Sequence, residues 1–446
     1  MNKSKVHIIS LGCPKNQVDS EVMAAAMTAK GFRLMPRRDD ASIILINTCA
    51  FILPAKEEAI EEILEAALWK KGAPDRHLVV TGCLPQRYKK ELSKALPEVD
   101  LFLGISEVPD IGLYLDMLLS GEKSRRMVVG SPTFLMNAAN KRIISTPQGS
   151  AYIKISEGCS NNCSFCVIPS IRGKARSRKM EDILEEASEL ASRGVRELIL
   201  IAQDTTAYGR DLKGKPPLSV LLAELAKIND INWIRLLYLH PARITEELLR
   251  TIANEEKICD YLDVPVQHSD DSILKAMRRQ GSSPFLRQVI AQARDIIPGV
   301  AIRTSLIVGF PGETPKRFEN LHSFIQEIRF DHLGVFPYSR EEGSYAASFP
   351  SRISEQEKLR RRDILMEEQA IISGNINNRL IGTMQDVLVE GKSELSEFPV
   401  TGRCRRQAPE IDGVTYLKGG KPKEGEIVSC RITGAGDYDL FAEMTN

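Results

Sequence analysis

The chain is poor in aromatic residues and has almost no excess charge. Phe, Trp and Tyr make up 6% of its 446 residues, and 60 basic side chains balance 59 acidic ones, a net charge of +1. No polybasic run is present, so direct binding of nucleic acid is doubtful. The hydrophobic share of 43% is ordinary for a globular protein, and the length predicts more than one domain.

Long apolar runs and a disulfide pattern are also missing. No stretch approaches the roughly 18 apolar residues of a membrane helix, and the N-terminus enters a strand without the apolar core of a secretion signal. The nine cysteines are odd in number and are not spaced as a disulfide framework. A reducing compartment, the cytoplasm, is therefore expected, with no membrane association. Cys259, Cys404 and Cys430 have no neighbours at ligand spacing and are interpreted as structural.

Three of the remaining cysteines are spaced for an iron–sulfur cluster. Cys159, Cys163 and Cys166 form C-x3-C-x2-C directly after an apolar strand at 151–155. A four-iron cluster normally takes four thiolates, so three would leave one iron open to a small molecule. A structural zinc site would want a second pair of ligands about a dozen residues away, and none follows. Burial as small hydrophobes is the other alternative, but the spacing favours the cluster.

A second group of three cysteines is dispersed along the N-terminal part. Cys13, Cys49 and Cys83 lie 36 and 34 residues apart, each just beyond a predicted strand. If the strands are parallel, these positions share the sheet edge where ligands gather, and the thiols could hold a second cluster. A single cysteine there is better explained as a small buried residue. Three equivalent positions, two of them after glycine, favour a metal site.

The pattern of strands and helices predicts an α/β protein with an N-terminal parallel α/β domain. Over residues 1–120, apolar strands at 6–10, 42–46 and 77–80 alternate with helices such as 54–71. Residues 121–148 are predicted to be a linker, with a basic patch from Lys123 to Arg126.

Residues 149–378 predict a second parallel sheet. The six strands expected here are 151–156, 197–201, 233–239, 261–266, 300–308 and 332–337. Six βα units are too few for a closed eight-stranded barrel, so a partial (β/α)6 barrel is predicted, followed by a charged helix over 353–378. Ligands bind at the carboxyl ends of such strands, and Cys159 follows the first one.

The tail, residues 379–446, has a different pattern. Short strands at 384–389, 413–417 and 426–431 are separated by turns that contain glycine. This pattern predicts a small antiparallel β-barrel.

The Cys159 group, with Phe165 between its last two thiols, resembles the cluster loop of the radical S-adenosylmethionine (SAM) superfamily. Together with the N-terminal thiols and the β-rich tail, it makes the whole chain similar to the radical-SAM methylthiotransferase family, whose tail is a TRAM domain. The type that modifies an aspartate of a ribosomal protein is matched most closely by three segments, 10–16, 168–178 and 330–339.

The resemblance implies two four-iron (4Fe–4S) clusters and SAM as cofactors, with all six cysteines as metal ligands and catalytic residues. One SAM would be the methyl donor, and a second would give the 5′-deoxyadenosyl radical at the Cys159 group. The β-carbon of aspartate carries no acidic hydrogen, so a radical is better suited than a base to abstract it. The Cys13 group would then supply the sulfur.

Other residues at predicted strand ends are candidates for binding SAM. A helix cap is the alternative for Asp204, a structural role is the alternative for His268, and Arg172 to Arg178 form a basic stretch that either is solvated or clamps carboxylates. The expected SAM-binding residues are Phe165, Gln203, Asp204, Gln267, His268, Arg303 and Gly309.

The partners implied by the resemblance are a small-subunit ribosomal protein, free or ribosome-bound, and a reductase as electron donor. From 379 to 446 the tail has nine Lys/Arg against eleven Asp/Glu, a balance that repels phosphates and attracts a basic protein. Two alternatives stay open. A transfer-RNA adenosine methylthiotransferase would draw positive charge from the Lys123–Arg126 patch, and a non-enzymatic electron-transfer protein would hold clusters without cleaving SAM.

Overall fold

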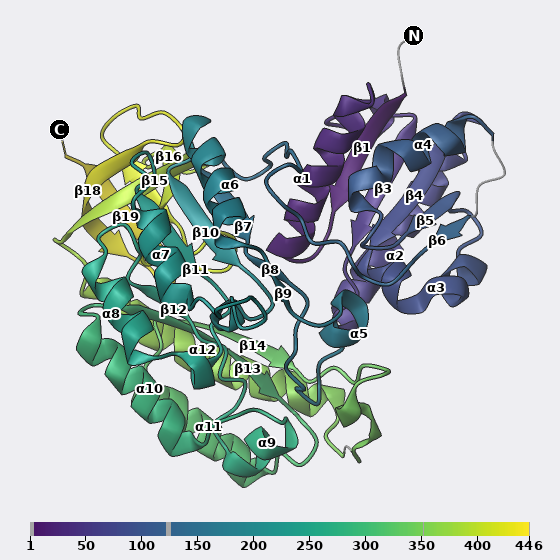
Figure 1. Cartoon of the computed structure of the whole chain (residues 1–446). Helices are drawn as coiled ribbons and strands as arrows, with labels where there is room; N and C mark the ends of the chain where they lie inside the picture. The colour runs from purple at the N-terminus through teal and green to yellow at the C-terminus, as the bar shows by residue number, and fades with distance from the viewer. Residues whose placement is uncertain (1–3, 122–125, 351, 446) are drawn as a thin grey trace. The chain divides into compact units, whose positions relative to one another are not determined.

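The computed structural model describes residues 4–121, 126–350 and 352–445, which fall into two compact units (Figure 1). The first unit combines the N-terminal residues up to 145 with 156–178 and 339–347. The second combines 146–155, 179–338 and the residues from 348 onward. Most of the predicted basic patch, Lys123 to Arg125, lies outside the described residues. Among the described helices, none is both long and apolar enough to cross a bilayer.

The first unit is built on a parallel six-stranded sheet in the order β2-β1-β3-β4-β5-β6. Its elements are β1 (Lys5–Ser10), α1 (Pro14–Ala29), β2 (Arg33–Leu34), η1 (Arg38–Asp40), β3 (Ile43–Thr48), α2 (Leu53–Lys70), β4 (His77–Gly82), α3 (Cys83–Ala95), β5 (Leu101–Leu103), η2 (Val108–Asp110), α4 (Ile111–Leu119), β6 (Met127–Val128), β8 (Ser156–Glu157), α5 (Ile168–Arg172) and β9 (Arg176–Ser177).

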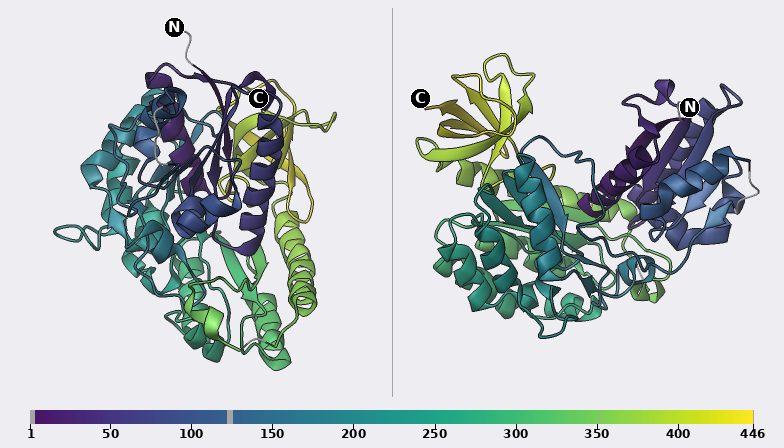
Figure 2. Two further views of the ribbon diagram at one scale, coloured as in Figure 1. Left: turned by 90° about the vertical axis from the view of Figure 1, so that its right-hand side faces the viewer. Right: turned by 45° about the horizontal axis from the view of Figure 1, so that its top comes forward.

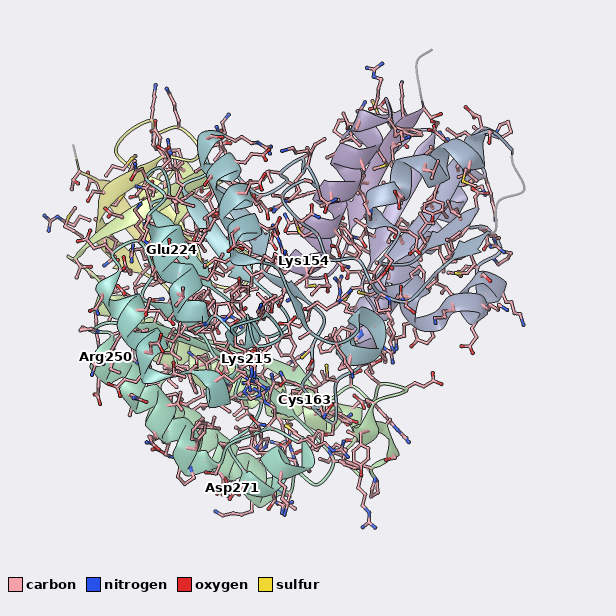
Figure 3. The ribbon with its side chains drawn as sticks, viewed as in Figure 1. Lys154, Cys163, Lys215, Glu224, Arg250 and Asp271 are labelled. Carbon is pink, nitrogen blue, oxygen red and sulfur yellow. The ribbon has the colours of Figure 1, made fainter. Side chains whose placement is uncertain are left out.

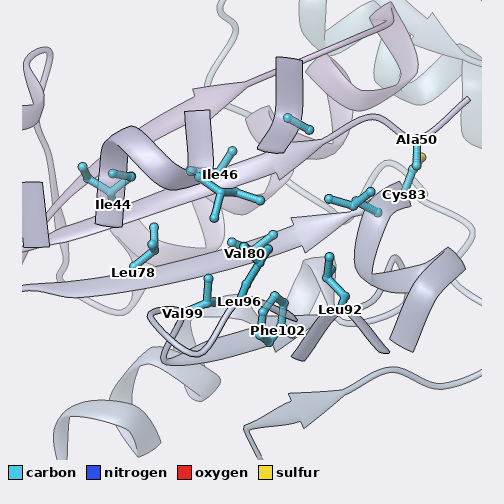
Figure 4. Packing of buried hydrophobic residues seen from close by; sticks show 14 of the residues in the cluster. Ile44, Ile46, Ala50, Leu78, Val80, Cys83, Leu92, Leu96, Val99 and Phe102 are labelled. Carbon is cyan, nitrogen blue, oxygen red and sulfur yellow. The ribbon is translucent and has the colours of Figure 1, made fainter. Parts of the chain in front are cut away.

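The order of this sheet places a ligand site at a defined edge. Strand β3 is buried along its whole length. Helices α2 and α3 pack against it and contribute Ile63 and Leu92 to the core cluster. Leu92 lies there with Ile46 of β3 (Figure 4). The chain runs outward from β1 in one direction to β2 and in the other to β3. In open parallel sheets, ligands bind outside the carboxyl ends of the strands at such a reversal.

Part of the predicted linker belongs to this unit. Met127–Val128 form the edge strand β6, and Arg142 pairs with Glu21 of α1 at 2.7 Å. A strand of two residues carries no hydrophobic period, so the sequence pattern gave no indication of it.

The second unit contains six parallel strands in two hydrogen-bonded runs, β7-β10-β11 and β12-β13-β14. The amide of Leu239 donates to the carbonyl of Asp263 at 2.8 Å where the two runs adjoin, so the sheet is an open (β/α)6 barrel, as predicted. Its elements are β7 (Ser150–Lys154), α6 (Met180–Ser192), β10 (Glu197–Ile201), η3 (Thr205–Ala207), α7 (Leu218–Ala226), β11 (Trp233–Leu236), η4 (Pro241–Arg243), α8 (Glu246–Asn254), β12 (Tyr261–Asp263), α9 (Asp271–Ala276), α10 (Ser283–Ile296), β13 (Ala301–Val308), α11 (Pro315–Ile328) and β14 (His332–Pro337).

The predicted C-terminal barrel is present and closed, in the order β15-β16-β17-β19-β18 (yellow in Figure 2). One detail differs from the prediction, because β17 and β19 pair in parallel and the barrel is not wholly antiparallel. Cys404 and Cys430 lie in its apolar core. The remaining elements are η5 (Tyr345–Ser348), α12 (Glu355–Asn378), β15 (Met384–Lys392), β16 (Val400–Cys404), β17 (Thr415–Lys418), β18 (Ile427–Ala435) and β19 (Leu440–Met444).

Candidate iron–sulfur and SAM site

Cys13, Cys49 and Cys83 lie at one edge of the N-terminal sheet. They follow the carboxyl ends of β1, β3 and β4, and these three strands are hydrogen-bonded neighbours. Cys13 is the residue that precedes α1, and Cys83 is the first residue of α3, at one end of the core cluster beside Ala50 (Figure 4). The fold therefore brings the dispersed thiols to the point where the strand order reverses.

Gly12 lets the first thiol loop approach the second. Its φ is +92°, in the left-handed region, and a Cβ atom there would lie 2.5 Å from Cβ and 3.0 Å from Sγ of Cys49. Only glycine provides both the backbone angle and the space. A glycine at this position is thus required by the packing of the Cys13 loop against Cys49.

The environments of Cys13 and Cys49 shift the pKa values of these two thiols in opposite directions. Desolvation alone would raise the pKa of Cys13, but Lys15, Arg172 and backbone amides lower it below the usual value. Burial, reinforced by the neighbouring Cys83 and Cys13, raises the pKa of Cys49 to about 12. Because iron binds thiolates, binding of a cluster must displace the proton from Cys49.

The Cys159 group lies on a loop of the same first unit. The loop is flanked by β8 and β9, which pair antiparallel, and Cys163 is labelled in Figure 3. Backbone amides point at two of the thiols: Asn161 donates to Cys159 Sγ at 3.4 Å, and Ile168 donates to Cys166 Sγ at 3.4 Å. The backbone of this loop is thus arranged to stabilise thiolates.

Arg172, at the end of α5, is the buried residue that joins the two thiol groups. Its guanidinium contacts both carboxylate oxygens of Glu157 at 3.1 Å, Asp19 at 3.1 Å and Asn16 Oδ1 at 2.5 Å. Its Nη2 also lies 3.6 Å from Cys83 Sγ. The sequence showed only a basic stretch here, whereas the structure buries Arg172 with 2% of its surface exposed.

Four of the predicted SAM-binding residues lie at the carboxyl edge of the central sheet. Gln203 and Asp204 follow β10, and Asp204 accepts a hydrogen bond from Arg243 at 2.6 Å. Gln267 and His268 follow β12, and Gln267 has a φ of +71°, which is strained for a residue with a side chain. The described structure thus gathers these residues along one edge of the second unit.

His268 has a fixed tautomer. Its Nδ1 accepts hydrogen bonds from the amides of Ser269 and Asp270, both at 2.9 Å. Burial lowers its pKa to about 4, so at neutral pH the ring is uncharged and its hydrogen is on Nε2. Among the described residues, none accepts a hydrogen bond from this Nε2. Buried donors in proteins nearly always have an acceptor, so this N–H is available to an ordered water or a ligand.

Arg303 and Gly309 each lie against a distant part of the chain. Arg303 is the third residue of the eight-residue β13 and so does not reach its carboxyl end. It contacts Asp263 at 3.1 Å and Asp412 of the C-terminal barrel at 3.4 Å. Gly309 is at the carboxyl end, but the space beside its Cα is filled by the side chain of Lys358 from α12. Contacts from distant parts of the chain therefore occupy both residues.

The two thiol groups fit iron–sulfur clusters by their donor chemistry. None of the six cysteines is in a disulfide bond, and each group offers three thiols. Within the described residues, no three Cys, His, Asp or Glu side chains converge as closely as ligands of a single ion do. A polynuclear cluster takes each thiolate on a different iron, so it does not require such convergence.

The open (β/α)6 sheet and the C-x3-C-x2-C loop that follows its first strand define a radical SAM enzyme. Residues 153–325 match the model of the radical SAM superfamily, residues 5–104 match that of the uncharacterized protein family UPF0004, and residues 381–445 match that of the TRAM domain. The family therefore implies a 4Fe–4S cluster and SAM.

Two curated relatives extend the match to the whole chain, and both are named ribosomal protein uS12 methylthiotransferase RimO. The protein of Syntrophus aciditrophicus is 59% identical, and the alignment covers 100% of this chain and 99% of that protein. The protein of Geobacter sulfurreducens is 49% identical, with 99% of each chain covered. The chain belongs to the RimO family of methylthiotransferases.

Solved structures agree in fold. The radical SAM methyltransferase TsrM from Kitasatospora setae superposes with a TM-score of 0.53 at 14% identity, over 75% of this chain and 73% of that one. The cobalamin-dependent radical SAM enzyme OxsB gives a TM-score of 0.51 at 12% identity, over 83% of this chain and 56% of that one. At these identities the likeness concerns the fold alone.

Proposed function

We propose that this enzyme attaches a methylthio group to the β-carbon of an aspartate in ribosomal protein uS12. The observation that carries the proposal is the pair of separate three-thiol groups in one compact unit, Cys159 to Cys166 and Cys13 to Cys83. The names of relatives that match the full chain supply the substrate.

Two 4Fe–4S clusters are part of the proposal, one at each thiol group. When bound, the cluster at Cys159, Cys163 and Cys166 would supply the electron that cleaves SAM, and the one at Cys13, Cys49 and Cys83 would hold the sulfur to be transferred. The chain itself holds the thiols in place. Gly12 sets the approach of two loops, and backbone amides donate to the Cys159 loop.

The SAM-binding residues are proposed from their position and chemistry. Gln203, Asp204 and Gln267 offer polar groups at the strand edge where ligands of such sheets bind. His268 offers its Nε2–H to a ribose or carboxylate oxygen. Phe165, half-buried between Cys163 and Cys166, would lie against the adenine. We propose that Arg303 and Gly309 shape the SAM site indirectly. Arg303 forms an ion pair with Asp263, and Gly309 leaves space for the side chain of Lys358.

The charge of the TRAM domain supports a protein substrate. The nine basic residues of the tail are already fewer than its eleven acidic ones. Three of the nine donate to the central domain: Arg403 to Glu197, Arg405 to the carbonyl of Ile258, and Arg406 to Asp331. The remaining surface is poor in cations for phosphates and suits a basic ribosomal protein. A reductase as electron donor and a cytoplasmic location complete the proposal.

The test is mass spectrometry of ribosomes from a strain that lacks the gene. Ribosomal protein uS12 should be lighter by about 46 Da, the mass of CH3S in place of hydrogen. The chain supplied in trans should restore the mass, and a Cys159→Ala variant should not. Unchanged uS12, with a methylthio group lost from a transfer-RNA adenosine, would show that the substrate is RNA.

A further inference from the structure

Arg172 forms a buried junction between the loops that carry the two thiol groups. Glu157, which it contacts through both carboxylate oxygens, lies two residues before Cys159. Asn16 and Asp19, which it also contacts, belong to the helix that follows Cys13. One side chain thus contacts the start of the Cys159 loop, the helix after Cys13 and the thiol of Cys83.

Asn16 extends this junction to the third thiol of the N-terminal group. Its side-chain amide donates to the carbonyl oxygens of Leu11 and Thr48, each at 3.0 Å. Leu11 precedes Cys13 by two residues, and Thr48 precedes Cys49 by one. Through Asn16, the position of Arg172 is therefore connected to the backbone beside Cys13 and Cys49 as well as directly to Cys83.

Stability alone is a poor explanation for this arrangement. A buried ion pair costs so much desolvation that apolar residues of similar volume often stabilise a fold equally well. The planar, forked guanidinium is required where several partners must be held at fixed angles. Here the partners are two carboxylates, an amide oxygen and a thiol.

We propose that Arg172 is a positioning residue. It fixes the two thiol groups relative to each other and donates a hydrogen bond to the Cys83 thiolate. The inference rests on the proposed function and adds a role for a residue that binds neither substrate nor SAM. A reduced cluster carries one more negative charge than an oxidised one. The positive charge and the hydrogen bond of Arg172 stabilise the reduced form more, so they would raise the reduction potential of a cluster bound at the Cys13 group. A fixed position of one thiol group relative to the other keeps SAM cleavage coupled to sulfur transfer.

The first measurement is a redox titration of the N-terminal cluster, followed by electron paramagnetic resonance. It uses full-length protein in which Cys159, Cys163 and Cys166 are alanine, so that one cluster contributes the signal. Arg172→Gln should shift the midpoint to a more negative potential. Arg172→Lys should shift it less, because the positive charge remains.

The second measurement is the coupling ratio, 5′-deoxyadenosine formed per methylthio product, in otherwise unaltered enzyme. Both Arg172 variants should raise it, since an ammonium cannot contact Glu157 and Asn16 together in the geometry of a fork. Because a hydrogen bond to a charged group is lost, we expect this ratio to rise about tenfold or more.

Arg142→Gln is the matched control. Arg142 is also buried and pairs with a carboxylate, Glu21 at 2.7 Å, in the same unit. Its variant should keep both the potential and the ratio. If Arg142→Gln changes them as much as Arg172→Gln, or if Arg172→Lys leaves both unchanged, the positioning role is wrong. If the unaltered enzyme forms no methylthio product from uS12, the proposed function fails, whereas the redox titration still decides the role of Arg172.

Discussion

At the scale of single residues, Gly12 lets the N-terminal thiols lie close together because it has no side chain. The first thiol loop can lie against Cys49 because Gly12 has no Cβ atom and tolerates a φ of +92°. The same packing brings the thiols close enough that Cys83 and Cys13 raise the pKa of Cys49. The glycine before Cys13 therefore shapes the candidate cluster site without being a proposed ligand.

Gly12→Ala should weaken the N-terminal cluster selectively. The new Cβ would lie 2.5 Å from that of Cys49 and displace its thiol. Iron per chain after anaerobic reconstitution should fall from about eight toward about four. Gly194→Ala is the matched control, because Gly194 has the same φ of +92° with no atom within 4 Å. Equal iron loss in both variants would mean that backbone strain alone, and not the contact with Cys49, is responsible.

The two thiol groups could be predicted from the sequence because their spacing, or their place after a strand, is local information. Arg172 could not be, because its partners Asn16 and Asp19 lie more than a hundred residues away. The placement of Arg303 and Gly309 depends in the same way on Asp412 and Lys358. Which side of a strand end is free for a ligand is decided by such tertiary contacts.

At the scale of elements, a buried ionic group joins the central sheet to the C-terminal barrel. Glu197, the first residue of β10, accepts hydrogen bonds from Arg235 of β11 at 2.7 Å and Arg403 of β16 at 2.6 Å. All three side chains are at most 1% exposed. Burial disfavours the charged carboxylate, but the two guanidinium groups outweigh it and lower the pKa of Glu197 to about 2.

The low pKa of Glu197 predicts a pH-dependent stability. In the unfolded chain, a glutamate has a pKa of about 4.3, so the stabilisation is complete above that pH and is lost as the pH falls toward 2. Glu197→Gln leaves two buried cations uncompensated and should lower the free energy of unfolding by about 3–5 kcal/mol at pH 7. Urea unfolding of the cluster-free chain should show this difference shrinking below pH 4.3 or so.

Glu357→Gln is the control for the Glu197 variant. The carboxylate of Glu357 also has a pKa lowered to about 2, by hydrogen bonds from Arg360 and Arg361, but it lies near the surface. Its replacement should have a much smaller effect, because exposed pairs contribute little. Equal effects of the two substitutions would contradict the explanation from burial.

The sequence located the long strands and helices well, because period and length suffice for elements such as α11 and β10. It missed several shorter strands, among them β5, β6, β16 and β19. The pairing of β19 with β17 is set by barrel closure, and the two-residue β6 pairs with the neighbouring β5. Such elements take their conformation from partners that no local pattern indicates.

At the scale of the whole molecule, both thiol groups belong to one compact unit, although the second lies within the segment matched to the radical SAM superfamily. The chain leaves the N-terminal unit to form β7, returns for residues 156–178, and leaves again for the central sheet. This path places both thiol groups in one compact unit, so loss of one group need not unfold the central sheet.

Replacement of Cys13, Cys49 and Cys83 together by alanine should remove about half of the iron, from about eight atoms per chain to about four. Of the three, Cys83 belongs to the apolar core cluster, where alanine keeps the Cβ atom, so the unit should still fold. Iron and sulfide analysis after anaerobic reconstitution measures the change. A variant that retains all its iron would mean that these cysteines are structural.

The two thiol groups should also separate by activity. Replacing Cys159, Cys163 or Cys166 should abolish 5′-deoxyadenosine formation from SAM under reduction, because this group is the proposed source of the electron. Replacing Cys49, which lies against Gly12 in the other group, should leave part of that cleavage but stop methylthiolation of uS12. Both products can be quantified by mass spectrometry in one reaction. Methylthiolated uS12 from enzyme that lacks Cys49 would place the sulfur source elsewhere, whereas loss of both products in that variant would show that SAM cleavage depends on the Cys13 group.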